Sequence, residues 1–315
     1  MKRTLTDVLR RGFDNAVANW PLVLIRVAET AVLIGISIGA LVAIVIPLVV
    51  SAKIGGWETL HPDPDAILTT VMAIVTDHWL LIVYLLLIAS GVLAVLLGIH
   101  SAVDAGSARV YLDAERAGSI SRMTTRERFD SFSMDSFLAG MREGWWRVFW
   151  IYNAAWLAAG LVLLAPLALG AALIAIIGAN AAALVLGCLI LVAMLLLSIV
   201  VAVLTNLWVE KAIVIALACG LAANAALREA RQGIRADFGR HLGLVIIVMV
   251  VGFAGGAALS SFSSGFPLHG SSFHWELLFL SPVIIASSLL NTAFSSAVAC
   301  WFLACVAAIQ QETPA

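Results

Sequence analysis

Six long apolar runs dominate the pattern of hydrophobic and polar positions along this chain of 315 residues. The runs are about 20–30 residues long, enough to cross a bilayer as helices, and they lack the alternation of apolar and polar positions that is typical of membrane β-strands. We therefore predict an all-α, polytopic integral membrane bundle, a single domain over residues 1–315. Its six spans lie at about residues 22–50, 79–103, 148–177, 181–209, 242–262 and 280–309. Residues 178–180 predict a tight hairpin between the third and fourth spans.

A short amphipathic segment precedes the first, third and fifth runs. The three segments are LRRGFDNAV (9–17), FLAGMREGW (137–145) and ARQGIRADF (230–238). Each has apolar residues three positions before, one position after and five positions after a glycine, so the apolar positions share one face of a helix. We predict three interfacial helices, each followed by a transmembrane hairpin, as three repeats over residues 5–111, 136–218 and 227–309. The alternative is coincidence, because segments between spans are generally basic and the glycine pattern is short.

These segments carry a resemblance to a known group of proteins. Residues 225–251 form a helix that leads into an apolar span, and residues 136–152 form an earlier counterpart. The arrangement resembles poorly characterised bacterial six-helix inner-membrane proteins, including the membrane domain that is fused to some glycerophosphodiester phosphodiesterases. The sequence has no segment that resembles the soluble catalytic domain of those enzymes. The resemblance therefore implies a fold, and it transfers no catalytic residue to this chain.

Composition supports a membrane protein, and charge orients it. The chain is 62% hydrophobic and 12% charged, whereas soluble domains average roughly 45–50% apolar and 25% charged residues. Of the 18 Lys and Arg residues, 16 lie at the N-terminus or around the segments that follow the second and fourth spans. The positive-inside rule then places both termini in the cytoplasm, and we predict a multi-pass protein of the inner (plasma) membrane. The net charge of −1 gives no indication of nucleic-acid binding.

Polar side chains inside the spans are the candidates for a functional site, because burying them in a bilayer is costly. The predicted intramembrane polar cluster consists of Arg26, Glu29, His100, Asp104, Asn153, Asn206, Glu210 and Asn291. Two interpretations stay open: structural ties near helix ends, which we favour, and a polar vestibule that opens to the cytoplasm. Arg26 and Glu29 are three residues apart, and His100 and Asp104 are four apart, so each pair can interact within its own helix.

Small residues in the spans predict close helix contacts. Gly35 and Gly39 in the first span, and Gly252 and Gly256 in the fifth, have the spacing that lets helices approach closely, within the chain or between copies. The four cysteines all lie in apolar stretches without metal-ligand spacing, and we expect them to be small buried side chains.

The sequence favours a function without chemistry. It contains no metalloprotease helix, phosphate-binding Gly-Lys loop, Gly-x-Ser-x-Gly turn or Cys/His metal spacing, so we predict no cofactor, no metal site and no catalytic residue. We predict a non-enzymatic membrane-organising or accessory protein that contacts anionic lipid headgroups, other membrane proteins or a second copy of itself. The predicted lipid-contacting residues are Arg10, Arg11, Arg142, Arg147, Arg228, Arg231 and Arg235. The alternative is a small-molecule or lipid transporter that uses the polar vestibule.

Overall fold

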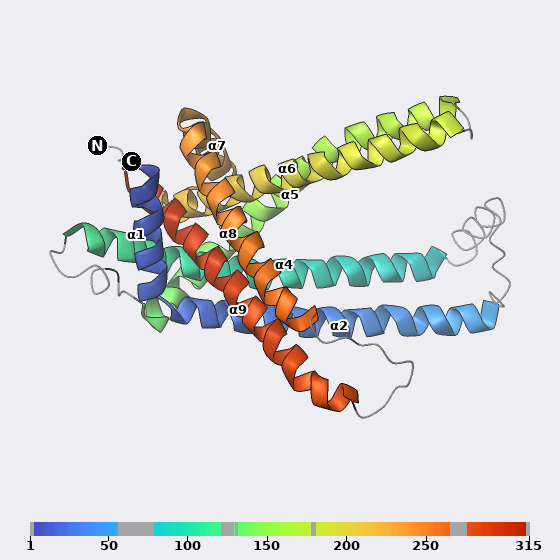
Figure 1. Cartoon of the computed structure of the whole chain (residues 1–315), viewed down its shortest axis with the longest axis horizontal. Helices are drawn as coiled ribbons and strands as arrows, with labels where there is room; N and C mark the ends of the chain where they lie inside the picture. The colour runs from blue at the N-terminus through green and yellow to red at the C-terminus, as the bar shows by residue number, and fades with distance from the viewer. Residues whose placement is uncertain are drawn as a thin grey trace. The chain divides into compact units, whose positions relative to one another are not determined.

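The computed structural model describes residues 3–55, 79–120, 129, 132–177, 181–264 and 276–312. These residues form eight α-helices and no strand (Figure 1). The helices are α1 (Leu5–Ala18), α2 (Pro21–Gly55), α4 (Trp79–Ile120), α5 (Met134–Ile177), α6 (Ala181–Cys219), α7 (Ala223–Ala236), α8 (Phe238–Ser264) and α9 (Glu276–Gln310). The hairpin turn predicted at 178–180, and the basic residues 2, 122, 126 and 128, lie outside the described residues.

Six of these helices are long and apolar enough to cross a membrane, which confirms the predicted all-α, six-span, multi-pass membrane fold. The candidate spans are Pro21–Pro47, Trp79–Gly118, Met134–Gly170, Val185–Cys219, Phe238–Ser261 and Ala286–Gln310. The second contains 40 residues, about twice the 20 that a bilayer requires. The helix of the second span, α4, continues past the end predicted at residue 103, and the helix of the third span, α5, begins before the start predicted at residue 148. No proline or glycine-rich break interrupts either helix there.

Burial changes along the length of the spans. The apolar stretches that are long enough to cross a bilayer leave large side chains exposed, such as Leu87 in α4, Leu161 in α5 and Phe253 in α8. The other ends of these helices are packed, and their fully buried side chains include Tyr111, Ile151, Ile213 and Leu303. We call residues 101–118, 137–159, 205–216 and 300–309 the packed ends. Exposed apolar flanks fit contact with lipid tails, and the core of the fold lies where the helices meet at their packed ends.

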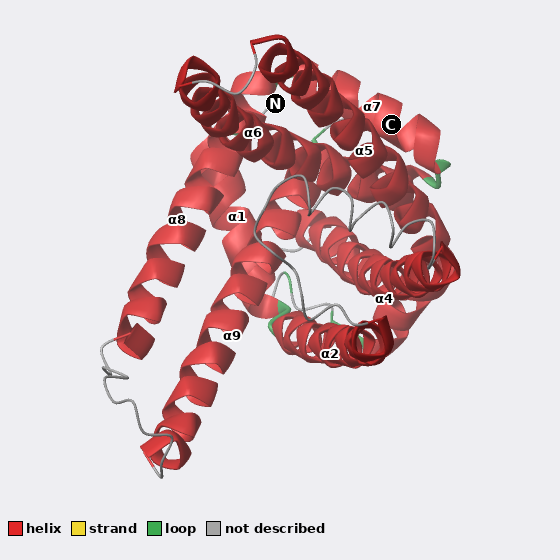
Figure 2. Ribbon diagram, turned by 90° about the vertical axis from the view of Figure 1, so that its right-hand side faces the viewer, coloured by secondary structure: helices red, strands yellow, loops and turns green. Residues whose placement is uncertain are grey.

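The chain divides into two compact units. Residues 28–100, which hold most of α2 and the apolar part of α4, form one unit. The other unit contains residues 1–27 and 101–315, and so holds α1, the packed end of α4, and α5 to α9. Within this second unit α5 pairs with α6, and α8 pairs with α9, as two hairpins (Figure 2).

The first and third predicted interfacial segments form separate helices, whereas the second does not. Helix α1 ends at Asn19, whose backbone N–H bonds to Asn15, and Pro21 then begins α2. Helix α7 ends at Asp237, directly before α8. In contrast, residues 137–145 are the first part of the continuous helix α5, because no Pro, Asn or Asp interrupts the chain between this segment and the span.

The glycines of the three segments each face a neighbouring helix, Gly12 and Gly140 closely and Gly233 at ordinary van der Waals distance. Helix α1 packs on α9 and α7 packs on α6, while the start of α5 meets the packed end of α4. A Cβ built on Gly140 would lie 2.9 Å from the Ala105 carbonyl oxygen, and one on Gly233 would lie 3.6 Å from Lys211 Cε. In terms of the predicted repeats, α1 of the first contacts α9 of the third, α5 of the second contacts α4 of the first, and α7 of the third contacts α6 of the second. Each segment therefore contacts the second span of another repeat. The boundaries of the repeats remain a prediction.

Candidate functional site

An arginine, an aspartate and a tyrosine form a buried tie between three helices. Arg26 Nη2 of α2 donates to Asp104 Oδ1 of α4, and the Tyr152 hydroxyl of α5 donates to Asp104 Oδ2. Asp104 is 1% exposed, and its two partners are also buried. Glu210 of α6 and Cys300 of α9 lie close enough to interact electrostatically with this group. Sequence reasoning missed Tyr152, whose position in α5 gave no signal until the packing of the helices was known.

A second tie links α2 and α4 within residues 28–100. His100 Nδ1 lies 2.6 Å from Glu29 Oε1, and the Glu29 side chain is 4% exposed. Both ties therefore join one helix to another, whereas the sequence suggested pairing within each helix. A carboxylate buried beside a charged or hydrogen-bonding partner avoids most of the cost of its burial.

The three asparagines of the predicted polar cluster do not join these ties. Asn153 Nδ2 donates to the Phe149 carbonyl of its own helix at 2.8 Å. Asn206 and Asn291 are exposed on α6 and α9. The structure therefore brings together Arg26 with Asp104 and Glu29 with His100, and it leaves the amide side chains apart.

Glu115 is a third buried anchor, and sequence reasoning missed it. Its carboxylate, with no exposed side-chain surface, accepts from Arg11 Nε at 2.7 Å and from Asn15 Nδ2 at 3.4 Å, while Arg3 Nη1 lies 3.8 Å away. These contacts fasten α1 to the packed end of α4. Arg11, which the sequence assigned to the lipid surface, is thus engaged by a buried carboxylate.

The twelve described arginines fall into two equal groups. Six have a carboxylate partner within ion-pair distance, and these are Arg3, Arg11, Arg26, Arg109, Arg116 and Arg240. Six have no such partner among the described residues, and these are Arg10, Arg142, Arg147, Arg228, Arg231 and Arg235. All of the second group except the half-buried Arg147 are exposed. Every member of this second group was predicted to contact lipid.

Exposed tryptophans accompany two of these arginines. Trp146 stacks on Phe149 with ring centroids 5.5 Å apart, and it meets Trp145 and Trp150 edge to face. A groove of about 440 Å³ runs between this cluster and the start of α7, with Arg147 along its wall. Tryptophan is enriched where a membrane meets water, and this cluster has the composition of such a boundary.

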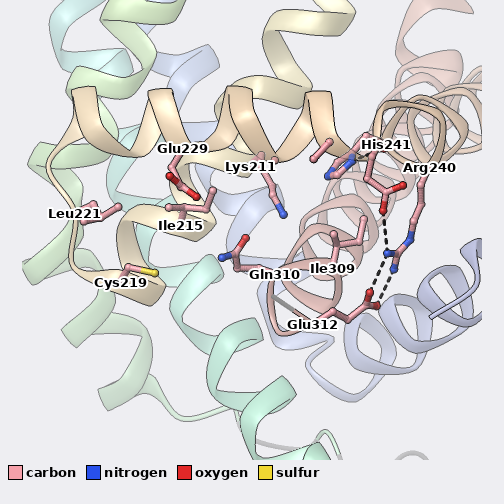
Figure 3. Close-up of a pocket in the computed structure, with 13 residues that line it drawn as sticks. Lys211, Ile215, Cys219, Leu221, Glu229, Arg240, His241, Ile309, Gln310 and Glu312 are labelled. Carbon is pink, nitrogen blue, oxygen red and sulfur yellow. Dashed lines mark hydrogen bonds and ion pairs between the residues drawn. The ribbon is translucent and has the colours of Figure 1, made fainter. Parts of the chain in front are cut away.

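A cavity of about 310 Å³ lies beneath α7, between this helix and the ends of α6, α8 and α9 (Figure 3). We call it the α7 cavity. Gly220, whose φ of 68° requires a residue without a side chain, turns the chain from α6 into α7 beside it. Arg240 holds one wall, because its Nη1 and Nη2 donate to Glu312 at 2.9 and 2.7 Å and its Nη1 also lies 3.4 Å from Asp237. Lys211 from α6 and His241 from α8 complete the polar lining.

Neither a metal centre nor a known relative identifies this site. Among the described residues no group of three or more His, Cys, Asp or Glu side chains is arranged to hold a metal ion. No protein-family model, no curated protein and no solved structure matches this chain. The resemblance to six-helix inner-membrane proteins stays a prediction.

Proposed function

We propose that this protein is a non-enzymatic membrane-organising or accessory protein whose basic helices bind anionic lipid headgroups on the cytoplasmic side of the inner membrane. The observation that carries the proposal is the division of the arginines. Arginines inside the fold have carboxylate partners, whereas those on α1, α5 and α7 that are exposed have none among the described residues.

Helix α7 has the arrangement that this function requires. Ala226, Leu227 and Ala230 are buried, and Arg228, Arg231 and Arg235 are exposed at the spacing of one helix face. The Trp208 indole of α6 donates to the Leu227 carbonyl at 2.7 Å and fixes the helix in place. A basic residue near an anionic membrane surface contributes roughly 1 kcal/mol, so three on one rigid helix give a useful preference for anionic lipid.

The test measures lipid preference around the complete protein. The protein is reconstituted in phosphatidylcholine bilayers, and electron spin resonance compares the fraction of spin-labelled phosphatidylglycerol that is immobilised at its surface with that of spin-labelled phosphatidylcholine. We expect the wild type to prefer phosphatidylglycerol, and the triple variant Arg228→Gln, Arg231→Gln, Arg235→Gln to lose much of this preference. High salt reduces the same preference because it screens exposed charges.

Arg116→Gln is the matched control, because this exposed arginine already has Asp113 as a partner at 3.5 Å. Its lipid preference should equal that of the wild type. If the triple variant also retains the wild-type preference, the proposed role of α7 is wrong.

The geometry favours this proposal over a transporter with a cytoplasmic polar vestibule. That alternative requires the polar side chains of the spans to line a shared space. Arg26 and Asp104 are instead buried against each other, and Asn206 and Asn291 are exposed on separate helices.

A further inference from the structure

The α7 cavity contains the ammonium group of a buried lysine that has no partner among the described residues. Lys211 is 3% exposed as a residue, and no described residue forms a hydrogen bond or ion pair with its Nζ. Its side chain enters the cavity from α6 and points its nitrogen into the open space, and a Cβ built on Gly233 would lie 3.6 Å from its Cε (Figure 3). Burial of a charge is costly unless a partner compensates for it, so this position is suited to an anionic group that comes from outside the chain.

His241 adds a buried acceptor to the same cavity. Its Nδ1 lies 2.9 Å from the Asp237 carbonyl oxygen, which can only accept, so the Nδ1 position carries the hydrogen. The other ring nitrogen, Nε2, then presents a lone pair when the imidazole is neutral. This atom is buried and has no hydrogen-bond partner among the described residues, and the whole residue is 2% exposed. A donor, such as an N–H group, is the missing partner here.

The charge of the lining decides what kind of ligand fits. Arg240 pairs with Asp237 and Glu312, and Arg3 lies 3.8 Å from the same Glu312 carboxylate, so two arginines balance these two acidic side chains. Lys211 and Glu229 are then the two charged lining residues without an ion-pair partner in the described part of the chain, one positive and one negative. A simple anion would satisfy Lys211 and leave Glu229 unpaired, while a simple cation would leave Lys211 unpaired.

We propose that the α7 cavity binds a zwitterion that joins a singly charged phosphodiester to a primary ammonium group. The phosphodiester oxygens pair with Lys211, and the ammonium N–H groups donate to His241 Nε2 and to the Glu229 carboxylate. The volume of about 310 Å³ is at the lower end of the range for small-molecule sites, which fits a headgroup-sized ligand. An ethanolamine phospholipid headgroup and the water-soluble glycerophosphoethanolamine share this chemistry, and the position at the ends of three candidate spans gives either access.

The test uses the purified full-length protein in maltoside micelles and measures its thermal unfolding midpoint. Glycerophosphoethanolamine is compared with glycerophosphoglycerol, which lacks the amine, and with glycerophosphocholine, whose quaternary amine has no N–H group. We expect a saturable rise of the midpoint with the ethanolamine compound alone, because a ligand that binds only the folded state stabilises it. A second arm compares nanodiscs of phosphatidylcholine with nanodiscs that also contain phosphatidylethanolamine. A rise of the unfolding midpoint in the nanodisc arm alone assigns the ligand to the phospholipid. A rise in the micelle arm shows that the soluble compound binds as well.

Two variants separate binding from folding. Lys211→Met removes the unpaired charge while keeping a long side chain, so it should raise the midpoint of the unliganded protein and abolish the ligand-dependent rise. Glu229→Gln changes an exposed residue with little risk to the fold, and it should reduce the discrimination between the ethanolamine and glycerol compounds. Arg116→Gln, which changes an exposed residue of α4 that does not line the cavity, is the control, and its ligand response should match the wild type.

This inference is independent of the proposed lipid-surface function. If the triple arginine variant loses its preference for phosphatidylglycerol while its response to the ethanolamine compound is unchanged, the result bears on the lipid-surface function and not on the cavity. If neither the soluble compound nor the phospholipid raises the wild-type midpoint above that of its two analogues, the cavity holds water alone and the proposal is overturned.

Discussion

Gly12 of α1 lies directly against the backbone of Cys305 in α9. A Cβ built on Gly12 would be 2.9 Å from both the nitrogen and the Cα of Cys305, and it would also overlap the Cys305 Sγ. The indole of Trp301 donates to the Leu9 carbonyl at 3.1 Å and holds the two helices together beside this contact. The glycine therefore sets the distance between the first and last helices of the chain.

Gly12→Ala should destabilise the protein by about 1–3 kcal/mol, the usual cost of overpacking a closely packed contact. Backbone atoms surround the position, so the added methyl group cannot be accommodated by a side-chain rotation. Thermal unfolding of the purified variant measures the effect. Gly35→Ala is the control, because no described atom of the α2–α4 hairpin lies within 4 Å of the position that its added methyl group would occupy, and alanine favours the helix. Equal midpoints for the two variants would contradict the close α1–α9 contact.

Asp104→Ala should cost about 3–5 kcal/mol, because it leaves the buried Arg26 guanidinium without its carboxylate partner. The double variant Arg26→Leu, Asp104→Leu removes both charges and should recover most of the lost stability. Asp113→Ala provides the matched control, since Asp113 pairs with Arg109 and Arg116 at a partly exposed position and should cost less than about 1 kcal/mol. If Asp104→Ala destabilises the protein no more than Asp113→Ala does, the Arg26–Asp104 ion pair contributes little to stability.

The six spans and the amphipathic character of α1 and α7 follow from the sequence, because run length and apolar periodicity are local properties of the chain. The partners of Arg26 and Glu29 do not. Each depends on how α2 and α4 are rotated about their axes and on their relative register, and a uniformly apolar helix carries no periodicity that sets its rotation. Pairing within a helix was the only arrangement that spacing alone could suggest.

The contacts of the small residues and the burial of the cysteines also depend on helix packing that their spacing along the chain does not reveal. Gly35 and Gly39 have the spacing of a helix contact, yet no described atom of their hairpin lies within 4 Å of a Cβ built on either glycine. Cys300 and Cys305 are buried as expected, whereas Cys188 and Cys219 are exposed. The repeated spacing singled out Gly12 without indicating its contact with α9, and His241 had no distinguishing signal, because its role comes from the α7 cavity.

The start of α1 should lose protection at acidic pH. Thr4 and Asp7 cap this helix reciprocally, since Asp7 Oδ2 accepts from the Thr4 hydroxyl at 2.6 Å and from its backbone N–H at 3.2 Å. These hydrogen bonds hold the pKa of Asp7 below its ordinary value of 3.8. A carboxyl whose pKa is lowered by folding contributes stability above its unfolded pKa, and this contribution is lost as the pH falls through the folded value.

Amide hydrogen exchange measures this capping effect. The protection factors of the first turn of α1 should fall for the wild type as the pH is lowered from 7 to below 3.8, and those of Asp7→Asn should change less. Protection in α7 is an internal reference, because the Ala222 cap of that helix has no side-chain hydrogen bond to lose. A wild-type profile identical to that of Asp7→Asn would exclude the reciprocal cap.

Both ends of the described chain should lie on one side of the membrane. The Arg3 backbone N–H donates to the Glu312 carboxylate at 3.4 Å, and Arg240 at the start of α8 binds the same carboxylate. An even number of spans returns the chain to the side on which it began, and the positive-inside rule predicts that this side is the cytoplasm. Alkaline phosphatase, which is active only after export, should therefore be active when fused after Val50 and inactive when fused after Gly118 or Glu312. Activity after Glu312 together with inactivity after Val50 would reverse the orientation. Activity after only one of Gly118 and Glu312 would contradict the even number of spans that the Arg3–Glu312 contact requires.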